Sequence, residues 1–172
     1  MRRAAFISRA ETDSEFADFG VLVREYVASL SFPLDFQDFE GELRDLSQIF
    51  GPPSGAAFLA IDDQPPFPAP TPVGCSGVRR FDDGVAELKR MYVQPAARGR
   101  GHGQALCVAA IDAARELGYS SIRLDTVAEL TAAAGIYTSL GFVLIPPYRE
   151  NPFESARYYE LRLEPDEDER VN

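Results

Sequence analysis

A short loop rich in glycine and arginine carries the clearest chemical signal in the sequence. It runs from Arg98 to Gly103 and reads RGRGHG, between an expected strand and an expected helix. Glycines let a backbone come close to a bulky phosphate group, and the unpaired N–H groups of a helix's first turn point toward an anion. Arg98 and Arg100 can add charge-assisted hydrogen bonds, whereas the side chain of His102 is expected to face solvent. The loop therefore predicts a site for a phosphate-bearing ligand.

The spacing of the glycines separates this loop from two common phosphate-binding motifs. A Walker loop requires Gly-Lys-Ser/Thr after four intervening residues, and the dinucleotide fingerprint requires G-x-G-x-x-G after the first strand of a parallel βαβ unit. Here Gly99, Gly101 and Gly103 follow a predicted hairpin, so both alternatives fit poorly. Taken alone, the loop is also compatible with an ordinary helix start.

The elements that must position the loop follow one another as strand and helix patterns. Asp83-Gly84 between two strand-like runs predicts a β-hairpin, and Thr12 with Glu15 predicts a capped helix start. The expected strands cover residues 4–8, 56–61, 73–80, 85–93, 122–126, 142–145 and 156–163. The expected helices cover residues 12–30 and 35–49, a segment from the glycine loop to Leu117, and residues 130–140. The order β-α-α-β-β-β-α-β-α-β-β indicates an α/β fold of the α+β type, with a mixed sheet covered by helices.

Length and composition are typical of one globular domain. The chain has 172 residues, 45% of them hydrophobic; residues 1–163 are expected to form the domain and residues 164–172 an acidic, disordered tail. The net charge of −10 argues against a nucleic-acid surface, which needs clustered Lys and Arg. No stretch approaches the roughly 20 apolar residues of a membrane span, and Cys75 and Cys107 are expected to be buried thiols. These features predict a cytoplasmic protein with no metal, no nucleic-acid partner and no membrane contact.

Three further segments accompany the loop. Val93 and Pro95 precede it at the end of a strand over residues 87–93; residues 124–126 form the strand after the next helix; and residues 137–142 read Y-x-x-L-G-F. The loop itself fits the pattern Q/R-x-x-G-x-G/A through Arg98, Gly101 and Gly103. In this combination the sequence resembles the GNAT superfamily of N-acetyltransferases, over about residues 4–163 and most strongly over residues 85–145.

The resemblance implies a GNAT-like fold, with a mixed, largely antiparallel central sheet flanked by helices, and acetyl-CoA as the acyl donor. It also implies that the strand carrying Met91 and Val93 bulges and splays from the next strand, which frees backbone groups to bind the pantetheine arm and to stabilise an oxyanion. The residues assigned to acetyl-CoA on this basis are Met91, Tyr92, Val93, Arg98, Gly99, Arg100, Gly101, His102, Gly103 and Thr126.

Two residues are assigned catalytic roles by the same resemblance. Tyr137 occupies the position of a tyrosine near the thioester sulfur, where a phenol with a pKa of about 10 can give a proton to the departing thiolate. The alternative for Tyr137 is a core aromatic. Glu87 lies where histone-acetylating members place a general base, and a carboxylate with a pKa of about 4.3 is expected to act through water. The alternative for Glu87 is an exposed strand carboxylate paired with Lys89 or Arg90.

Basic residues on two adjacent strands are candidates for the acceptor site. The cluster consists of Arg79, Arg80, Lys89 and Arg90. Such a cluster is unusual in an acidic chain, and its members either bind a substrate carboxylate or form surface ion pairs. The resemblance adds Tyr148 and Arg149 as residues of the acceptor wall, and an ordinary proline-rich turn is the alternative for them.

The leading hypothesis is that the protein transfers an acetyl group from acetyl-CoA to the primary amine of a small molecule by direct nucleophilic attack. Cys107 falls inside the expected coenzyme helix and is not expected to be a nucleophile. Two alternatives stay open, a protein or peptide N-acetyltransferase and a non-catalytic acyl-CoA-binding module. A homodimer is compatible with the resemblance, although no sequence feature fixes its interface.

Overall fold

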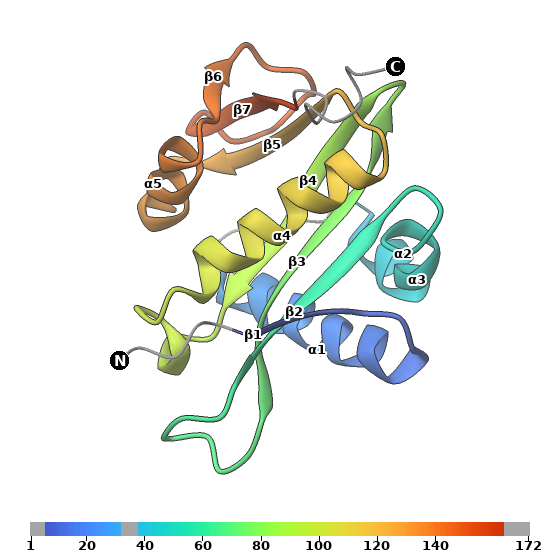
Figure 1. The fold of residues 1–172 in the computed structure, drawn as a ribbon. Coiled ribbons are helices and arrows are strands. Elements are labelled where there is room, and N and C mark those ends of the chain that lie inside the picture. Colours follow the sequence, from blue (N-terminus) through green and yellow to red (C-terminus); the bar gives the residue numbers. More distant parts are fainter. Residues whose placement is uncertain (1–5, 32–37, 164–172) are drawn as a thin grey trace, which may run out of the picture.

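The computed structural model describes residues 6–31 and 38–163 and is organised around one seven-stranded sheet (Figure 1). The strands are β1 (Phe6–Arg9), β2 (Ala56–Asp62), β3 (Thr71–Asp82), β4 (Val85–Val93), β5 (Ser121–Val127), β6 (Val143–Ile145) and β7 (Ala156–Arg162). Across the sheet their order is β1-β2-β3-β4-β5-β7-β6, and of these neighbouring pairs only β4 and β5 run parallel. The predicted mixed, largely antiparallel sheet is confirmed. Residues 164–172, predicted as an acidic tail, lie outside the described residues.

Helices cover both faces of this sheet. They are α1 (Asp13–Ser29), α2 (Phe39–Arg44), α3 (Leu46–Ile49), α4 (His102–Glu116) and α5 (Thr131–Ser139). α1 and α3 pack on a core that includes Phe19 and Tyr92, whereas α4 and α5 pack on a second core that includes Leu88 and Ile122. Figure 1 shows α4 lying across the strands on the second of these faces. Within the two described ranges, each helix is too short or too polar to cross a membrane.

The single helix predicted over residues 35–49 is wrong. Residues 35–37 lie outside the described residues, and from Phe39 onward the segment forms α2 and α3, which are separated at Asp45. At Asp45 φ is −117° and ψ is 24°, and its N–H donates to the carbonyl of Glu42, three residues back, at 3.1 Å. Aspartate favours helix ends over helix interiors because its short carboxylate competes for local backbone groups. Two short helices therefore replace the continuous one.

Two local predictions are confirmed. β3 and β4 form an antiparallel hairpin whose turn contains Gly84 at φ +69°, a left-handed conformation that glycine adopts without steric cost. At the start of α1, Thr12 Oγ1 accepts from the N–H of Glu15 at 3.3 Å, and Glu15 Oε2 accepts from the N–H of Thr12 at 2.9 Å. This reciprocal pair is the expected capping box.

β4 parts from β5 after its first residues, and this divergence opens the candidate site. The two strands pair only over residues 85–87 of β4. Against β3, β4 advances three residues, from Lys89 to Tyr92, while β3 advances two. The extra residue is accommodated next to Arg90, whose φ is +59°. The predicted bulge and splay are therefore confirmed, and the end of β4 keeps no ladder with β5.

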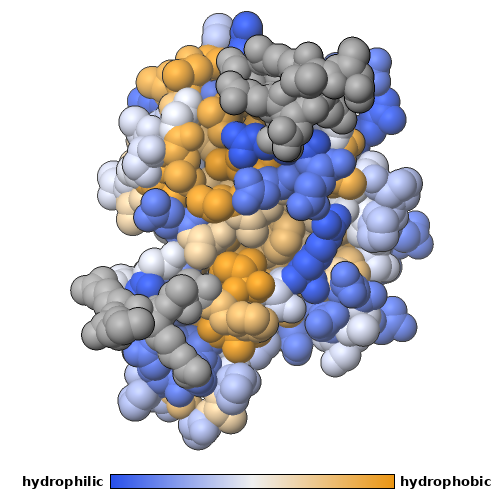
Figure 2. Space-filling model, in the orientation of Figure 1, coloured by the Kyte–Doolittle hydropathy of each residue, from blue (hydrophilic) through white to orange (hydrophobic). Residues whose placement is uncertain are grey.

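Apolar side chains are exposed in more than one region of the surface. Figure 2 shows one such region at the upper left of the molecule, over α5 and β6 of Figure 1, and another near the middle of the view. Val143 and Leu144 of β6 are 62% and 64% exposed, and β6 is an edge strand. Exposed apolar edges are typical of surfaces that associate. The homodimer nevertheless stays a prediction.

Candidate active site

The glycine loop has the geometry expected of an anion site. Gly99 and Gly101 have φ values of +77° and +90°, and a Cβ added to either would meet no atom within 4 Å. Open space therefore lies where side chains would otherwise project. The first hydrogen bond of α4 runs from the N–H of Ala105 to the carbonyl of Gly101 at 3.1 Å, so the amides of residues 102–104 precede the helical ladder. These amides and the helix dipole suit a phosphate group.

The side chains of Arg100 and His102 point to the inner side of the loop and contact one buried carboxylate. Arg100 Nη1 donates to Asp62 Oδ2 at 2.8 Å, and His102 Nε2 lies 2.9 Å from the same oxygen. Burial opposes ionisation of Asp62, but hydrogen bonds from the Gln64 amide, His102 and Arg100 outweigh it and lower the pKa of Asp62. His102 is only 5% exposed, so the expectation that it faces solvent is wrong. The buried carboxylate at the end of β2 holds both side chains inward and leaves the loop's backbone for a ligand.

Arg98 is held differently from Arg100. Its Nε donates to the carbonyl of Val93 at 3.0 Å, across the turn between β4 and α4. This bond ties the loop to the end of the strand that was predicted to bind the pantetheine arm. Val93 itself packs against the core formed by β2, β3 and α4.

A pocket lies between the diverging strands β4 and β5. Its walls include residues 88–91 of β4, residues 124–127 of β5, and the side chains of Tyr26, Tyr137 and Asn151. It thus brings together five parts of the chain, from α1, β4, β5, α5 and the segment before β7. The described residues contain no group of three His, Cys, Asp or Glu side chains placed to hold a metal ion.

Five predicted site residues line this pocket, and the others lie elsewhere. The lining residues are Lys89, Arg90, Met91, Thr126 and Tyr137. Tyr92 points into the core under α1, where its ring centroid is 5.9 Å from that of Tyr26. Arg80 is 61% exposed and pairs with Asp83 at 3.5 Å, which is the surface ion pair that was the alternative for this cluster.

Tyr137 reaches the pocket from α5 and is 6% exposed. Its ring packs against those of Phe142 and Tyr159, with centroids 5.7 Å and 6.2 Å away. Burial, together with the nearby Cys107, raises the pKa of Tyr137 well above its usual value. The phenol therefore keeps its proton, so it can donate a hydrogen bond or a proton to a group in the pocket.

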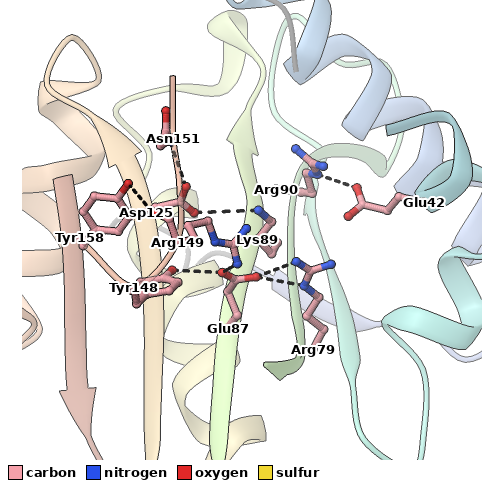
Figure 3. A network of polar contacts seen from close by, with 10 residues as sticks. All are labelled: Glu42, Arg79, Glu87, Lys89, Arg90, Asp125, Tyr148, Arg149, Asn151 and Tyr158. Carbon is pink, nitrogen blue, oxygen red and sulfur yellow. Dashed lines mark hydrogen bonds and ion pairs between the residues drawn. The ribbon is translucent and has the colours of Figure 1, made fainter. Parts of the chain in front are cut away.

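Glu87 is fully buried, and its carboxylate has a complete set of donors (Figure 3). Oε1 accepts from Arg79, with Nη2 at 2.8 Å and Nε at 3.0 Å. Oε2 accepts from the hydroxyl of Tyr148 at 3.0 Å and from Nη2 of Arg149. Tyr148 and Arg149, predicted to form the acceptor wall, are thereby fixed to the centre of the sheet.

The pKa of Glu87 follows from these partners. Burial raises it, but the positive charges of Lys89, Arg79 and Arg149 together outweigh burial and hold the pKa of Glu87 below its usual value. The exposed carboxylate that was the alternative for Glu87 is wrong because the side chain is buried, although the charge of Lys89, one of the two partners expected for it, does act on Glu87. The carboxylate of Glu87 is covered by Arg79 from the neighbouring strand β3 and by Arg149 from the loop before β7. It therefore does not face water.

Lys89 is the buried amine of the pocket. It is 6% exposed, and its Nζ lies 3.9 Å from Oδ1 of Asp125 on β5, which also accepts from Asn151 at 3.3 Å (Figure 3). Burial lowers the pKa of Lys89 to about 8, even though the carboxylates of Glu87 and Asp125 oppose the shift. Surface ion pairing, the alternative for Lys89, is therefore wrong.

Glu42 is a buried residue beside the pocket that was not among the predicted site residues. On α2 it is 5% exposed, and its Oε2 accepts from Nε of Arg90 at 2.6 Å. The one available signal is its position three residues after Phe39, on the apolar side of the predicted helix. Asp125 on β5 also lines the pocket.

Known proteins resemble this chain in sequence and in fold. The family model described as the acetyltransferase (GNAT) family matches residues 23–142. An uncharacterized N-acetyltransferase of Schizosaccharomyces pombe is 35% identical over 158 residues, which cover 91% of this chain and 94% of that protein.

Two solved structures share the fold at low sequence identity. The ribosomal-protein-S18-alanine N-acetyltransferase of Escherichia coli has a TM-score of 0.66 and 20% identity, over 92% of this chain and 94% of that one. A phosphinothricin acetyltransferase of Sinorhizobium meliloti, in complex with acetyl-CoA, has a TM-score of 0.66 and 15% identity, over 94% of this chain and 89% of that one.

Proposed function

Because this chain belongs to the GNAT acetyltransferase family, and is thus an acetyl-CoA-dependent N-acetyltransferase, we propose that its acceptor is the primary amine of a small molecule. One observation carries the proposal: a pocket between β4 and β5 contains the side chain of Tyr137 and lies at the end of the strand that leads into the phosphate loop. A site enclosed by β4, β5 and α5 suits a small acceptor better than a folded protein surface.

The residues proposed to hold acetyl-CoA follow the chain from β4 into α4. The amides of residues 99–104 bind the pyrophosphate, supported by the open space beside Gly99 and Gly101. The backbone of Met91, Tyr92 and Val93, beyond the point where β4 leaves β5, binds the pantetheine arm. Thr126 lines the opposite wall of the pocket.

Acetyl-CoA supplies an activated acetyl group in a thioester. The acceptor nitrogen forms a bond to the acetyl carbon, the bond from that carbon to sulfur breaks, and the sulfur leaves with the electron pair. We assign to Tyr137 the proton that the leaving sulfur takes up, because its phenol is neutral and lines the pocket.

The acceptor amine must also lose a proton before it attacks. By resemblance Glu87 is the carboxylate for this step, acting through water, but its lowered pKa makes it a weak base. Lys89 is a second candidate, since its pKa of about 8 leaves part of it neutral near pH 7. The pH profile of kcat/KM separates the two: a group that titrates near pH 8 supports Lys89, and one below pH 5 supports Glu87.

The proposal is tested by measuring CoA release from acetyl-CoA with a panel of small primary amines and, in parallel, with peptides that offer N-terminal or lysine amines. Turnover of a small amine well above hydrolysis supports the proposal. Turnover of peptides alone indicates a protein N-acetyltransferase, which is the activity named for the Escherichia coli structure. Tight acetyl-CoA binding without transfer to any amine indicates a binding module.

A further inference from the structure

Arg90 occupies an unusual position for an arginine. It lies at the β4 bulge with φ +59°, a conformation that is unfavourable for a residue with a Cβ and that glycine adopts freely. It is also 5% exposed. A buried, strained arginine persists only where its surroundings fix it, and such residues cluster at functional sites.

The guanidinium of Arg90 is only partly used by the protein. Nε donates to Glu42 at 2.6 Å, and the guanidinium carbon lies 5.5 Å from the centre of the Phe39 ring. Its Nη2 is buried and has no hydrogen-bond partner among the described residues. A buried charged donor without a partner is costly, and Arg90 lines the pocket. The guanidinium is therefore fixed in place with one nitrogen left for a ligand.

The charges around the pocket are not balanced. Figure 3 shows the network, which contains four basic and three acidic side chains: Arg79, Lys89, Arg90 and Arg149 with Glu42, Glu87 and Asp125. Nε of Arg149 is a second buried nitrogen without a partner among the described residues. The positive charge of Arg90 also contributes to lowering the pKa of Lys89, so the two cations lie close enough to repel each other. An anion between them would relieve that repulsion.

We propose that the acceptor carries a carboxylate as well as its amine, and that Arg90 binds this carboxylate from the wall of the pocket. The inference rests on the proposed function and names the class of its acceptor. A guanidinium matches the plane of a carboxylate and can donate two parallel N–H bonds to it. Glu42 is a positioning residue, because it holds Arg90 by Nε, while Nη2 has no partner among the described residues. Amines with a second positive charge are excluded by the same cations.

The first test uses the wild-type enzyme and matched acceptors. A panel of amino acids, with the amine at the α, β or γ position, is assayed with acetyl-CoA, and each is compared with its carboxamide. For the best acceptor we expect kcat/KM to exceed that of the carboxamide by about ten-fold or more, the effect of one charge-assisted hydrogen bond. Equal rates, or a preference for diamines, would overturn the inference but leave small-amine acetylation standing. Transfer to no amine at all would refute the proposed function itself.

The second test changes Arg90. In Arg90→Gln we expect the preference for the best amino acid over its carboxamide, measured as the ratio of their kcat/KM values, to fall about ten-fold or more. The matched control is Arg115→Gln, on the exposed side of α4, where the arginine pairs with Asp112 at 3.1 Å. Arg90→Gln leaves the buried carboxylate of Glu42 without its ion-pair partner, which can prevent the variant from folding. The double variant with Glu42→Gln removes this charge and is expected to lose the same preference for carboxylates. A folded variant that keeps the full preference for carboxylates would overturn the assignment.

Discussion

Replacing Glu87 by glutamine separates a structural from a chemical role for this residue. The substitution keeps the shape of a fully buried side chain but removes the charge that Arg79 and Arg149 share. Breaking a fully buried ion pair costs about 3–5 kcal/mol. The arginine side chains are 29% and 19% exposed, and solvent therefore screens part of the loss. We expect the free energy of unfolding to fall by about 2–4 kcal/mol, which for a chain of this length lowers Tm by roughly 5–15 °C.

The dependence of this loss on pH has a defined sign. The pKa of Glu87 is lower in the folded protein than in the unfolded chain, where it is about 4.3. Its contribution to stability is therefore complete above the unfolded pKa and is lost as the pH falls through the folded pKa. The difference between wild type and Glu87→Gln should be constant from about pH 6 to pH 8 and should shrink below about pH 4.

Urea unfolding followed by far-UV circular dichroism measures this difference, since the chain has no tryptophan for fluorescence. The matched control is Glu116→Gln: Glu116 is 67% exposed and pairs with Arg9 at 3.4 Å, and its loss should change stability by less than about 1 kcal/mol. If Glu87→Gln is as stable as wild type at neutral pH but loses most of its kcat, the structural reading is refuted, and Glu87 is the base.

Three further predictions concern the loop and the proposed acid. Gly101→Ala and Gly118→Ala both place a Cβ at strongly positive φ in open space, so each variant should lose about 1–2 kcal/mol of stability. Calorimetry should show weaker acetyl-CoA binding for Gly101→Ala and unchanged binding for Gly118→Ala, which is the control. Tyr137→Phe should lower kcat by about 100-fold or more at unchanged acetyl-CoA affinity, and a variant with normal kcat would exclude the acid role. Asp62→Asn, which loosens the hold on Arg100 and His102, should raise the Kd for acetyl-CoA by roughly ten-fold, whereas an unchanged Kd would contradict the bracing of the loop.

The parts of the site that the sequence predicted are those with local signals. The glycine loop follows a strand and starts a helix, and its conformation depends on φ values that glycine alone adopts easily, so spacing was sufficient to find it. Tyr137 and the β4 bulge were placed by resemblance, and no local property of Tyr137 distinguishes it from a core aromatic. These residues lie within about 60 positions of one another, over the segment where the resemblance is strongest.

The parts that the sequence did not predict depend on contacts between distant segments. Glu42 and Arg90 are 48 residues apart, and Asp62 and His102 are 40 apart. Each pair consists of two residues that look like surface residues, because charged side chains are usually exposed unless a partner accompanies them into the interior. The partner appears only when the strands and helices are assembled, and the break at Asp45, which ends α2 just after Glu42, has no counterpart in the apolar pattern of residues 36–46.

The net charge of the whole chain also differs from the charge at the pocket. The chain is negative, whereas two of the three charged side chains that line the pocket are basic. A net charge of −10 argues against long polyanions such as nucleic acids, whose binding needs many exposed cations. It does not argue against one carboxylate, because exposed charges are screened beyond about 8–10 Å at physiological ionic strength, while buried charges are screened far less. At the pocket the relevant charges are the buried Lys89 and Arg90, which line its wall. The negative net charge of the chain is therefore compatible with the proposed binding of an anionic small molecule by these few buried cations.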